Sequence, residues 1–456
     1  MGICGTGVGA LAGMLKKKGY IVTGSDQHVY PPMSDFLDSL GIGVKSSYKP
    51  ENLNPKPDLV IVGNVIRRDN PEAVALENAG IHYLSMPQAL SHFFLGDKTC
   101  LVVCGTHGKT TTASLLATML HFIGNEPGFM IGGIVQAFKR NFNISPNRYF
   151  VIEGDEYDTA FFDKGPKFLH YRPQIAIITS IEFDHADIYS DLEAVKASFS
   201  KLVAIMPKSG AIVANIDDEI VRDIVSKAGC KVVGYGLSKH AQWSYTDLDI
   251  GNAQTTFTAL KDGAIFAKYT SNMPGHHNAM NALAVTAVLD LIGIPSQDCT
   301  ESLAKFPGVR RRQEVRGVRN GITIIDDFAH HPTAVKETLA ALRKAYAQNR
   351  LVAVFEPRTN SSRKNIFQTA YAQVFSQADE ILIKKPIPLD SLPEDQMFSS
   401  SRLADDLAGQ GKKAASFETT DSIINYIKKT AQHGDVLVIM SNGGFDDIHN
   451  RLLSEL

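Results

Sequence analysis

The sequence predicts an α/β protein with three domains, and three observations lead to this prediction. A chain of 456 residues has the length of about three domains at roughly 150 residues each. Apolar runs of strand type alternate with helical stretches, as in parallel sheets connected by helices. Glycine-rich turns near residues 5 and 105 each open such an alternation, and another starts after Phe306-Pro307-Gly308. We therefore expect domains at 1–97, 98–306 and 307–456.

The expected elements follow from the length and periodicity of the apolar runs. In the first domain they are strands at Ile21–Asp26 and Leu59–Val62 and helices around Ala10–Lys18 and Ser34–Leu40. In the second they are strands at Leu101–Cys104, Tyr149–Ile152, Ile175–Thr179 and Ala211–Asn215, antiparallel strands within Gln242–Tyr269, and helices at Ala113–Phe122 and Asn278–Ile292. In the third they are strands at Thr323–Asp326, Leu351–Phe355, Glu380–Ile383 and Val436–Met440, with a surface loop at Lys384–Glu394. The first and third domains are therefore expected to be Rossmann-like, and the middle one to contain a mixed sheet.

Composition narrows the class of protein. Hydrophobic residues make up 44% and charged residues 21%, as in ordinary globular proteins, and the net charge of −2 does not favour nucleic acid as a partner. No run approaches the ~18 apolar residues of a membrane span. The five cysteines (Cys4, Cys100, Cys104, Cys230 and Cys299) are expected to be reduced thiols of a cytoplasmic protein. Only Ile3 precedes the first glycine loop where a strand is expected, so we expect the natural chain to begin earlier.

The segment Gly105-Thr106-His107-Gly108-Lys109-Thr110-Thr111 is the strongest single motif. It follows a buried strand and precedes a helix, so backbone N–H groups of the turn and of the helix start face an anion. Lys109 would supply a charge for the β- and γ-phosphates, and the Thr110 hydroxyl suits a Mg²⁺ ligand. Two residues separate the glycines where the standard phosphate loop has four. We predict a compact ATP-binding P-loop.

A second glycine loop lies at the start of the chain. Gly5-Thr6-Gly7-Val8-Gly9 resembles the first part of a dinucleotide-binding fingerprint, and Asp26 follows about 20 residues later, as a ribose-binding acid would. NAD, FAD or the pyrophosphate of a UDP-sugar would fit, and so would a tight turn without ligand. Because ATP is assigned to the second domain, a nucleotide-linked substrate is the favoured interpretation.

Carboxylates and a histidine follow two further strands. Glu153, Asp155, Glu156 and Asp158 come after the first, and the segment Glu182–His185 comes after the second. Both would meet the phosphate loop at the carboxyl edge of a sheet, which suggests a magnesium–ATP site. Glu153 is a candidate metal ligand, and His185 is either a ligand or a structural histidine.

Three polar segments in the last part of the chain have two interpretations each. His276–Asn281 opens a helix, where His277, Asn278 and Asn281 either contact a base or cap the helix. Arg310–Arg312 is either a solvated basic run or an anion-binding one. Asp326–Pro332 follows a strand and ends where a helix would begin, a position at which polar groups often build sites.

The order of these motifs along the chain resembles the Mur ligase family of peptidoglycan synthesis, and the resemblance covers essentially the whole chain. It is most similar to the family member that joins UDP-N-acetylmuramate to the tripeptide L-Ala-γ-D-Glu-meso-diaminopimelate in murein recycling. The segments that favour this member are Val29–Ser34, Glu153–Phe162, Phe168–Pro173, Phe355–Asn360 and Ser441–Phe445. The member that adds L-alanine typically has Glu-Ala-Asp-Glu-Ser-Asp where this chain has Glu-Gly-Asp-Glu-Tyr-Asp, and it stays as the alternative.

The resemblance implies a role for each motif. Lys109 would hold the ATP phosphates, Thr110 and Glu153 would bind Mg²⁺, and His185 would bind a second Mg²⁺. His277, Asn278 and Asn281 would contact the adenine, and Arg312 and Asp327 would close over the ATP. Gly5, Thr6, Gly7, Val8, Gly9 and Asp26 would hold the UDP part of the substrate. His330 is the candidate for the base that deprotonates the attacking amine.

Two departures limit what the resemblance implies. Some family members carry a carbamylated lysine shortly after the Asp-His pair, where this chain has Phe199 or Ser200, so none is expected. The diaminopimelate-adding member has an Asp-Asn-Pro-Arg motif that is absent here, which leaves the residues that contact the diaminopimelyl end unassigned. The first domain argues against a folylpolyglutamate-type synthetase. A non-catalytic nucleotide-binding or UDP-sugar-binding regulator is the alternative from another class.

Overall fold

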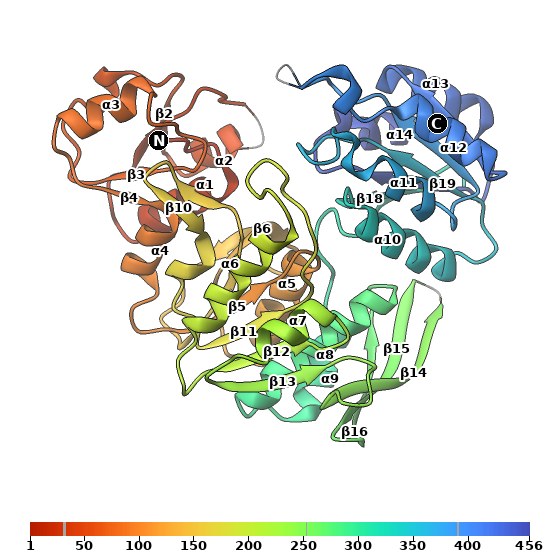
Figure 1. Cartoon of the computed structure of the whole chain (residues 1–456), viewed down its shortest axis with the longest axis horizontal. Helices are drawn as coiled ribbons and strands as arrows, with labels where there is room; N and C mark the ends of the chain where they lie inside the picture. The colour runs from red at the N-terminus through yellow and green to blue at the C-terminus, as the bar shows by residue number, and fades with distance from the viewer. Residues whose placement is uncertain (31–32, 252, 390–391) are drawn as a thin grey trace. The chain divides into compact units, whose positions relative to one another are not determined.

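The computed structural model describes residues 1–30, 33–251, 253–389 and 392–456 (Figure 1). The fold divides into two compact units, each built from several stretches of chain. The first contains Met1–Glu182, Leu192–Gln242 and Ala284–Ile294, and the second contains Phe183–Asp191, Trp243–Leu283 and Pro295–Leu456. All five cysteines are free thiols. Among the described residues, no helix has both the length and the apolar character needed to cross a bilayer.

The amino-terminal part of the first unit holds two short pairs of parallel strands, β1 with β2 and β3 with β4. The first residues of the chain lie between the pairs, because the Met1 amino group donates to Ile61 O (2.8 Å) and Gly2 N–H donates to Ser25 O (2.9 Å). The elements are α1 (Thr6–Lys17), β1 (Thr23–Ser25), α2 (Met33–Ser39), β2 (Gly43–Lys45), η1 (Pro50–Leu53), β3 (Val60–Val62), α3 (Pro71–Asn78), β4 (Tyr83–Ser85) and α4 (Met86–Phe94). Ser85 starts α4 with a capping box, which satisfies free N–H groups of the first turn.

The larger part of the first unit is a sheet with the strand order β13-β12-β11-β5-β8-β6-β7. All its strands run parallel except β7, and β5 lies between β11 and β8. Its elements are β5 (Thr99–Cys104), α5 (Lys109–Phe122), β6 (Gly128–Val135), β7 (Arg140–Asn143), β8 (Tyr149–Glu153), η2 (Lys167–His170), β11 (Ile175–Ile178), α6 (Leu192–Ala204), β12 (Ala211–Asn215), α7 (Glu219–Val225), β13 (Lys231–Tyr235) and a small hairpin of β9 (Asp158–Ala160) and β10 (Asp163–Pro166). The carboxyl ends of β5, β8 and β11 therefore meet at one edge of the sheet.

Strand β5 is buried on both faces, since Cys100 to Cys104 are all inaccessible, as expected of a central strand covered by helices on both sides. Helix α5 follows it directly and is buried from Thr110 to Leu120. The tight connection between these two elements carries the phosphate-loop motif at the carboxyl edge.

The second unit opens with an antiparallel meander of β14 (Trp243–Gly251), β15 (Gln254–Lys261) and β16 (Ala264–Ser271). Helix α8 (His276–Leu291) starts in this unit, and α9 (Ser296–Ala304) packs on β16. The antiparallel arrangement confirms the prediction drawn from the alternation of apolar and polar residues in Gln242–Tyr269.

The rest of the second unit is a sheet with the order β17-β18-β22-β19-β20-β21, parallel except for β17. Its strands are β17 (Glu314–Arg319), β18 (Ile322–Asp327), β19 (Leu351–Phe355), β20 (Glu380–Lys384), β21 (Lys413–Phe417) and β22 (Val436–Met440). Its helices are α10 (Pro332–Ala345), η3 (Asn365–Phe367), α11 (Gln368–Val374), η4 (Glu394–Gln396), α12 (Ser400–Gly409), α13 (Thr420–Thr430), η5 (Phe445–Asp447) and α14 (Ile448–Glu455). Two apolar cores, one with α10 to α12 and one with α13 and α14, cover its two faces.

The fold confirms the predicted α/β class, with differences in detail. Strands β19 and β22 have the predicted bounds, whereas α5 begins at Lys109, four residues before the predicted start. The expected loop Lys384–Glu394 begins with the last residue of β20, and its residues 390 and 391 lie outside the described part of the chain. Residues 31 and 32 of the Val29–Ser34 segment also lie outside it.

Candidate active site

The compact loop after β5 depends on two glycines in the left-handed region of backbone space. Gly105 has φ +127°, and a Cβ there would lie 2.1 Å from Thr179 Oγ1 and 2.9 Å from Ser180 N. Gly108 has φ +79° and is the N-cap of α5. A residue with a Cβ is strained in this backbone conformation, and a Cβ at Gly105 would also collide with Thr179 and Ser180. The loop is therefore packed tightly against the residues that follow β11.

Lys109 points back over this loop and is held by three acceptors. Its Nζ donates to Gly105 O (2.6 Å), Thr106 O (3.3 Å) and Glu156 Oε1 (3.0 Å). Burial by itself lowers the pKa of Lys109, but nearby carboxylates, first among them Glu156, raise the pKa above its usual value. Lys109 is thus a permanent positive charge at the loop, suited to a phosphate anion.

Glu153, at the end of β8, is oriented by two hydrogen bonds. Thr110 Oγ1 donates to Glu153 Oε1 (2.8 Å), and Gly132 N–H donates to Glu153 Oε2 (2.7 Å). The pair places a hydroxyl and a carboxylate side by side, and hard cations such as Mg²⁺ prefer a few such oxygen ligands together with water and phosphate. The donor set of Thr110 and Glu153 fits Mg²⁺.

The other carboxylates of the acidic segment have different partners. Asp155 forms an ion pair with Lys167, and Tyr157 N–H donates to its other oxygen (3.0 Å). Burial alone would raise the pKa of Asp155, but Lys167 holds the pKa below its usual value. With Asp155 paired to Lys167 and Glu156 paired to Lys109, Glu153 is the carboxylate of this segment that faces the threonine of the loop.

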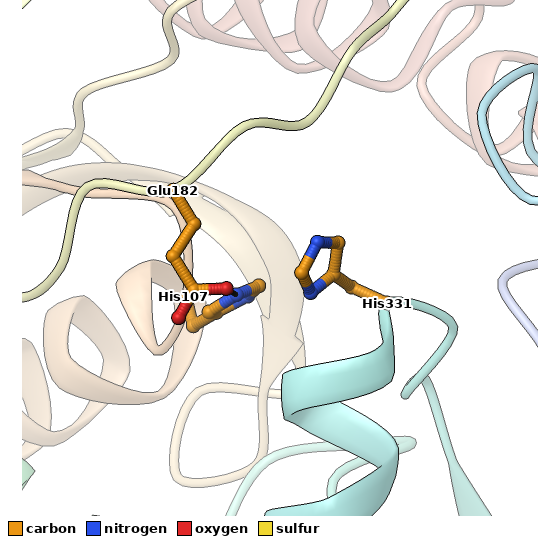
Figure 2. Close-up of side chains that lie close together, drawn as sticks. All are labelled: His107, Glu182 and His331. Atoms are coloured by element: carbon orange, nitrogen blue, oxygen red, sulfur yellow. Dashed lines mark hydrogen bonds and ion pairs between the residues drawn. The ribbon is translucent and has the colours of Figure 1, made fainter. Parts of the chain in front are cut away.

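The phosphate loop is also tied to the segment after β11. Thr106 N–H donates to Ser180 O (2.8 Å), and Glu182 N–H donates to Thr106 Oγ1 (2.9 Å). The imidazole of His107 lies beside the Glu182 carboxylate, at 3.2 Å (Figure 2). His331, drawn in the same figure, belongs to the second unit, where it caps α10 by accepting from Thr333 N–H. The contacts of Thr106 and His107 with Ser180 and Glu182 fix the shape of the phosphate loop.

Within the second unit, the Asp184–His185 segment lies near histidines of the Asp-Asp-Phe-Ala-His-His-Pro motif. Asp184 is buried, and Oδ1 accepts from His185 N–H (2.7 Å). Burial opposes ionisation of this carboxyl, but His185, His330 and His331 lower its pKa from 3.8 to about 2. The structure thus brings two histidine-containing motifs together that are about 145 residues apart in the sequence.

The start of α8 carries the residues expected at the adenine. Asn278 and Asn281 are buried, and Asn278 Nδ2 donates to Gln313 Oε1 (3.3 Å). Gln313 Nε2 lies 3.4 Å from His277 Nε2. His277 also pairs with Glu337 (Nδ1–Oε2 3.8 Å), and this neighbouring imidazole lowers the pKa of Glu337. These contacts connect helix α8 with α10 and with the residue after the arginine triplet.

Asp327 ends β18 and organises the loop that carries the arginine triplet. Its Oδ2 accepts from Gln313 N–H (2.8 Å) and its Oδ1 from Ala329 N–H (2.8 Å). Burial raises the pKa of Asp327, against the lowering effect of Arg312. The Arg312 guanidinium lies over the Phe328 ring, 4.7 Å from its centroid. Asp327 therefore holds the Arg312 loop in place.

The ring of His330, the candidate base, is oriented by a nearby main-chain carbonyl group. His330 Nδ1 lies 3.0 Å from Phe328 O, and Tyr371 OH donates to His330 O. A carbonyl oxygen can accept only, so neutral His330 carries its proton on Nδ1 and its lone pair on Nε2. That tautomer is suited to accepting a proton.

At the first glycine loop, Asp26 makes contacts within the protein. Its Oδ2 accepts from Cys4 N–H (2.8 Å), and its Oδ1 accepts from His28 N–H (3.0 Å) and Tyr48 OH (3.4 Å). Gly5 is the N-cap of α1, so the loop presents the amino end of that helix. Asp26 thus stabilises the shape of the loop by accepting the Cys4 N–H at its start.

A cavity of about 670 Å³ opens at the opposite edge of the sheet. It is lined by first residues of the parallel strands, such as Thr99, Tyr149 and Ile175, and by Arg148 and Lys208. Ligands of open parallel sheets bind at the carboxyl ends of the strands, where the loop and the acidic segments lie. The candidate active site is therefore at the carboxyl edge.

Sequence patterns alone missed several residues of this arrangement. Gln313, Glu337 and Lys167 lie outside every motif and are identified only by their contacts. Glu156 lies inside the acidic motif, but its pairing with Lys109 depends on the side-chain directions of two separate segments. Isolated polar residues gave no sequence signal for these partners.

Comparison with known proteins matches three successive parts of the chain to domain descriptions of one family. The description "Mur ligase family, catalytic domain" matches residues 1–97, "Mur ligase middle domain" matches 103–289, and "Mur ligase, glutamate ligase domain" matches 310–443. These matches extend over most of the sequence and include the phosphate loop, the acidic segments and the Asp327 loop.

Individual relatives agree with this assignment. The chain is 39% identical over 457 positions to the UDP-N-acetylmuramate–L-alanyl-γ-D-glutamyl-meso-2,6-diaminoheptandioate ligase of Escherichia coli, covering 100% of this chain and 97% of that relative. It is 32% identical over 457 positions to the UDP-N-acetylmuramate–L-alanine ligase of Geobacter sp., covering 100% and 96%. A crystal structure of a murein peptide ligase from Psychrobacter arcticus superimposes with a TM-score of 0.73 at 35% identity, covering 99% and 97%. The chain therefore belongs to the Mur ligase family.

Proposed function

We propose that this protein is an ATP-dependent ligase that joins UDP-N-acetylmuramate to the tripeptide L-Ala-γ-D-Glu-meso-diaminopimelate. The observation that carries the proposal is the arrangement of Lys109, Thr110 and Glu153 at the carboxyl ends of β5 and β8. A buried cation and a hydroxyl–carboxylate pair beside a phosphate loop suit the transfer of a phosphoryl group. The similarity to ligases of UDP-N-acetylmuramate along the whole chain supports the substrate.

In the proposed reaction, the lactyl carboxylate of UDP-N-acetylmuramate attacks the γ-phosphate of ATP, the bond to the β–γ bridging oxygen breaks, and an acyl phosphate forms while ADP leaves. The amine of the tripeptide then attacks the acyl carbon, the amide bond forms, and phosphate leaves. Lys109 would neutralise charge on the phosphates, and Thr110 and Glu153 would hold Mg²⁺, with His185 as a ligand of a second ion. A bound Mg²⁺ supplies Lewis-acid stabilisation of the transferred phosphoryl group.

Other residues would bind and orient the reactants. His277, Asn278 and Asn281 would contact the adenine, with Gln313 fixing the Asn278 amide. Arg312 would lie against the phosphates, since Asp327 fixes its loop. The Nε2 atom of His330 is our candidate for accepting the proton of the attacking amine.

We assign residues 1–97 to the UDP-sugar, 98–306 to ATP, and 307–456 to the peptide and to closure over the ATP. The glycine loop Gly5–Gly9 at the amino end of α1 suits the pyrophosphate of the UDP part. Asp26 would act in this domain by shaping the loop, because three donors of the protein already face its carboxylate.

The tripeptide is favoured over L-alanine by similarity along the whole chain, 39% against 32%. The acidic segment supports the same choice, since it has Gly154 and Tyr157 where the alanine-adding type typically has alanine and serine. Lys167 lies over the Tyr157 ring at 5.7 Å and pairs with Asp155, so Tyr157 is part of the structure around the loop.

A phosphate-release assay tests the proposal. ATP, Mg²⁺ and UDP-N-acetylmuramate are supplied with either the tripeptide or L-alanine, and the amide product is identified by mass spectrometry. We expect release that requires UDP-N-acetylmuramate and the tripeptide together. Phosphate release with L-alanine instead would identify the chain as the alanine-adding type. Nucleotide binding without any phosphate release would favour the non-catalytic regulator.

A further inference from the structure

The segment after Glu182 is held by a loop that is distant in the sequence. Phe183–Asp191 carries His185 and belongs to the second unit, as does the loop Thr359–Lys364, which we call the 359–364 loop. Ala186 N–H donates to Ser361 Oγ (3.2 Å), and Lys364 Nζ donates to Ala186 O (3.1 Å). Both polar main-chain groups of the residue next to His185 are therefore bound by side chains of this loop.

A third bond joins the same two segments. Asn360 Nδ2 donates to Asp187 Oδ2 (3.2 Å), while Arg363 donates to Asn360 Oδ1 (2.9 Å). The bond from Arg363 fixes which side of the Asn360 amide faces Asp187. Ser361 is only 3% exposed, so water competes little for its hydroxyl. The contact is a defined polar interface with complementary donors and acceptors.

The backbone at His185 requires such support. His185 has φ +56°, in the left-handed region that residues with a side chain seldom adopt. Ile188 and Tyr189 N–H both donate to His185 O, at 2.9 and 3.0 Å, which closes a tight turn. Unfavourable backbone conformations persist where the surroundings determine them, and here the next residue is the one bound by Ser361 and Lys364.

We propose that Ser361 and Lys364 are positioning residues that set the direction of the His185 side chain by holding the main chain of Ala186. The inference rests on the proposed function, because His185 matters there as a metal ligand. It means that a loop in the part of the chain assigned to the peptide substrate also orients a candidate metal ligand of the same unit. The alternative is that the contact only packs the 359–364 loop on the protein. In that case, removing the contact would leave the Mg²⁺ dependence of the reaction unchanged.

Amide hydrogen exchange of the full chain without ligands tests the contact. In Ser361→Ala and Lys364→Met we expect the peptides that cover 183–191 to exchange several-fold faster, while those that cover the phosphate loop are unchanged. Lys364→Arg keeps a donor and should restore slow exchange. Ser362→Ala is the matched control, because its hydroxyl is equally buried but bonds to Thr359 within its own loop. Circular dichroism establishes whether each variant is folded. If Ser361→Ala does not fold, Lys364→Met alone is used for the test.

The Mg²⁺ dependence of phosphate release tests the role. Loss of a group that orients a metal ligand typically costs 10- to 100-fold in metal affinity, so we expect the half-activating Mg²⁺ concentration to rise by roughly tenfold or more in both variants. The KM for UDP-N-acetylmuramate should stay unchanged, as should every parameter of Ser362→Ala. Exchange equal to that of the control, or faster exchange with unchanged Mg²⁺ dependence, would overturn the proposal. If the wild-type chain releases no phosphate with either acceptor, the proposed function has failed, and the exchange result still decides whether the 359–364 loop holds the segment.

Discussion

The ammonium group of Lys109 lies 3.0 Å from the carboxylate of Glu156, and both side chains are shielded from water. Each charge is needed to keep the other in the interior, since an isolated buried charge is strongly unfavourable. The phosphate loop is therefore held in a charged state before any anion reaches it.

Removing the Lys109 charge should abolish most of the ligase activity. In the double variant Lys109→Met/Glu156→Gln both charges disappear together, which avoids leaving one of them unpaired. We expect kcat to fall by roughly 10²- to 10³-fold, the usual effect of losing one group that stabilises transition-state charge. Phosphate release under saturating substrates measures it. Lys164→Met, which removes an exposed lysine paired with Asp158, is the control and should keep wild-type kcat.

Glu156→Gln should lower the free energy of unfolding at neutral pH by about 3 kcal/mol, because it leaves Lys109 charged and buried without its carboxylate. The sign of the pH dependence follows from the raised pKa of Lys109. The pair stabilises the fold fully below 10.5, the ordinary lysine value, and the stabilisation is lost as the pH rises through the raised folded-state pKa.

Urea unfolding between pH 7 and 11 should show the difference between wild type and Glu156→Gln narrowing above pH 10.5. Glu219→Gln, which removes an exposed carboxylate near Arg222, should change stability by less than about 0.5 kcal/mol. A difference that does not change with pH would show that Lys109 is not the group involved.

Asp184→Asn should reduce stability at neutral pH by roughly 2 kcal/mol, which corresponds to the depression of its pKa from 3.8 to about 2. A depressed carboxyl pKa stabilises the folded state above the unfolded value, and the effect is lost as the pH falls through the folded value. The two proteins should therefore converge in urea unfolding as the pH drops from 4 toward 2. Asp223→Asn on the exposed face of α7 is the control. Equal stability at pH 7 would contradict the prediction.

Gly154→Ala should destabilise the first unit, because the added Cβ would lie 2.3 Å from Cys104 Sγ and 2.8 Å from Val102 Cγ1. Overpacking of this kind costs about 1–3 kcal/mol. Cys104→Ala in the same chain removes the sulfur, so the double variant should recover much of the loss in urea unfolding. Gly165→Ala, where a Cβ would meet its nearest neighbour at 3.8 Å, is the control and should be close to wild type. A double variant no more stable than Gly154→Ala alone would mean that the sulfur is not the obstacle.

The elements that could be predicted from the sequence are those with strong local signals. Strands β19 and β22 are uninterrupted apolar runs, and their bounds were predicted to the residue. The start of α5 was predicted late, because the run Lys109–Thr112 has little helical character and is helical only because the loop glycine Gly108 starts the turn there. Strands β7, β17 and β21 contain several polar residues and carry no uninterrupted apolar run that predicts them, since their partners in the sheets, more than their own residues, determine them.

The candidate site shows the same division. Lys109, Thr110 and Glu153 could be named from motif spacing, because strand, glycine turn and helix occur in one local pattern. The ion-pair partners could not, since Glu156 and Asp155 lie in one acidic run and only the direction of each side chain decides which lysine it meets. Gln313 depends on a tertiary contact between α8 and a loop 35 residues away, for which a single sequence contains no signal.

The position of Cys104 has a chemical consequence. Its thiol is fully buried at the end of β5, directly before the phosphate loop, and burial raises the pKa of this thiol far above its usual value. Cys100, on the same strand, has a pKa raised by burial to about 12. Only the thiolate reacts readily with peroxide or disulfides, so both groups are protected at physiological pH. An oxidant that modifies exposed thiols is therefore expected to react slowly with Cys100 and Cys104, the two buried thiols of the strand that leads into the phosphate loop.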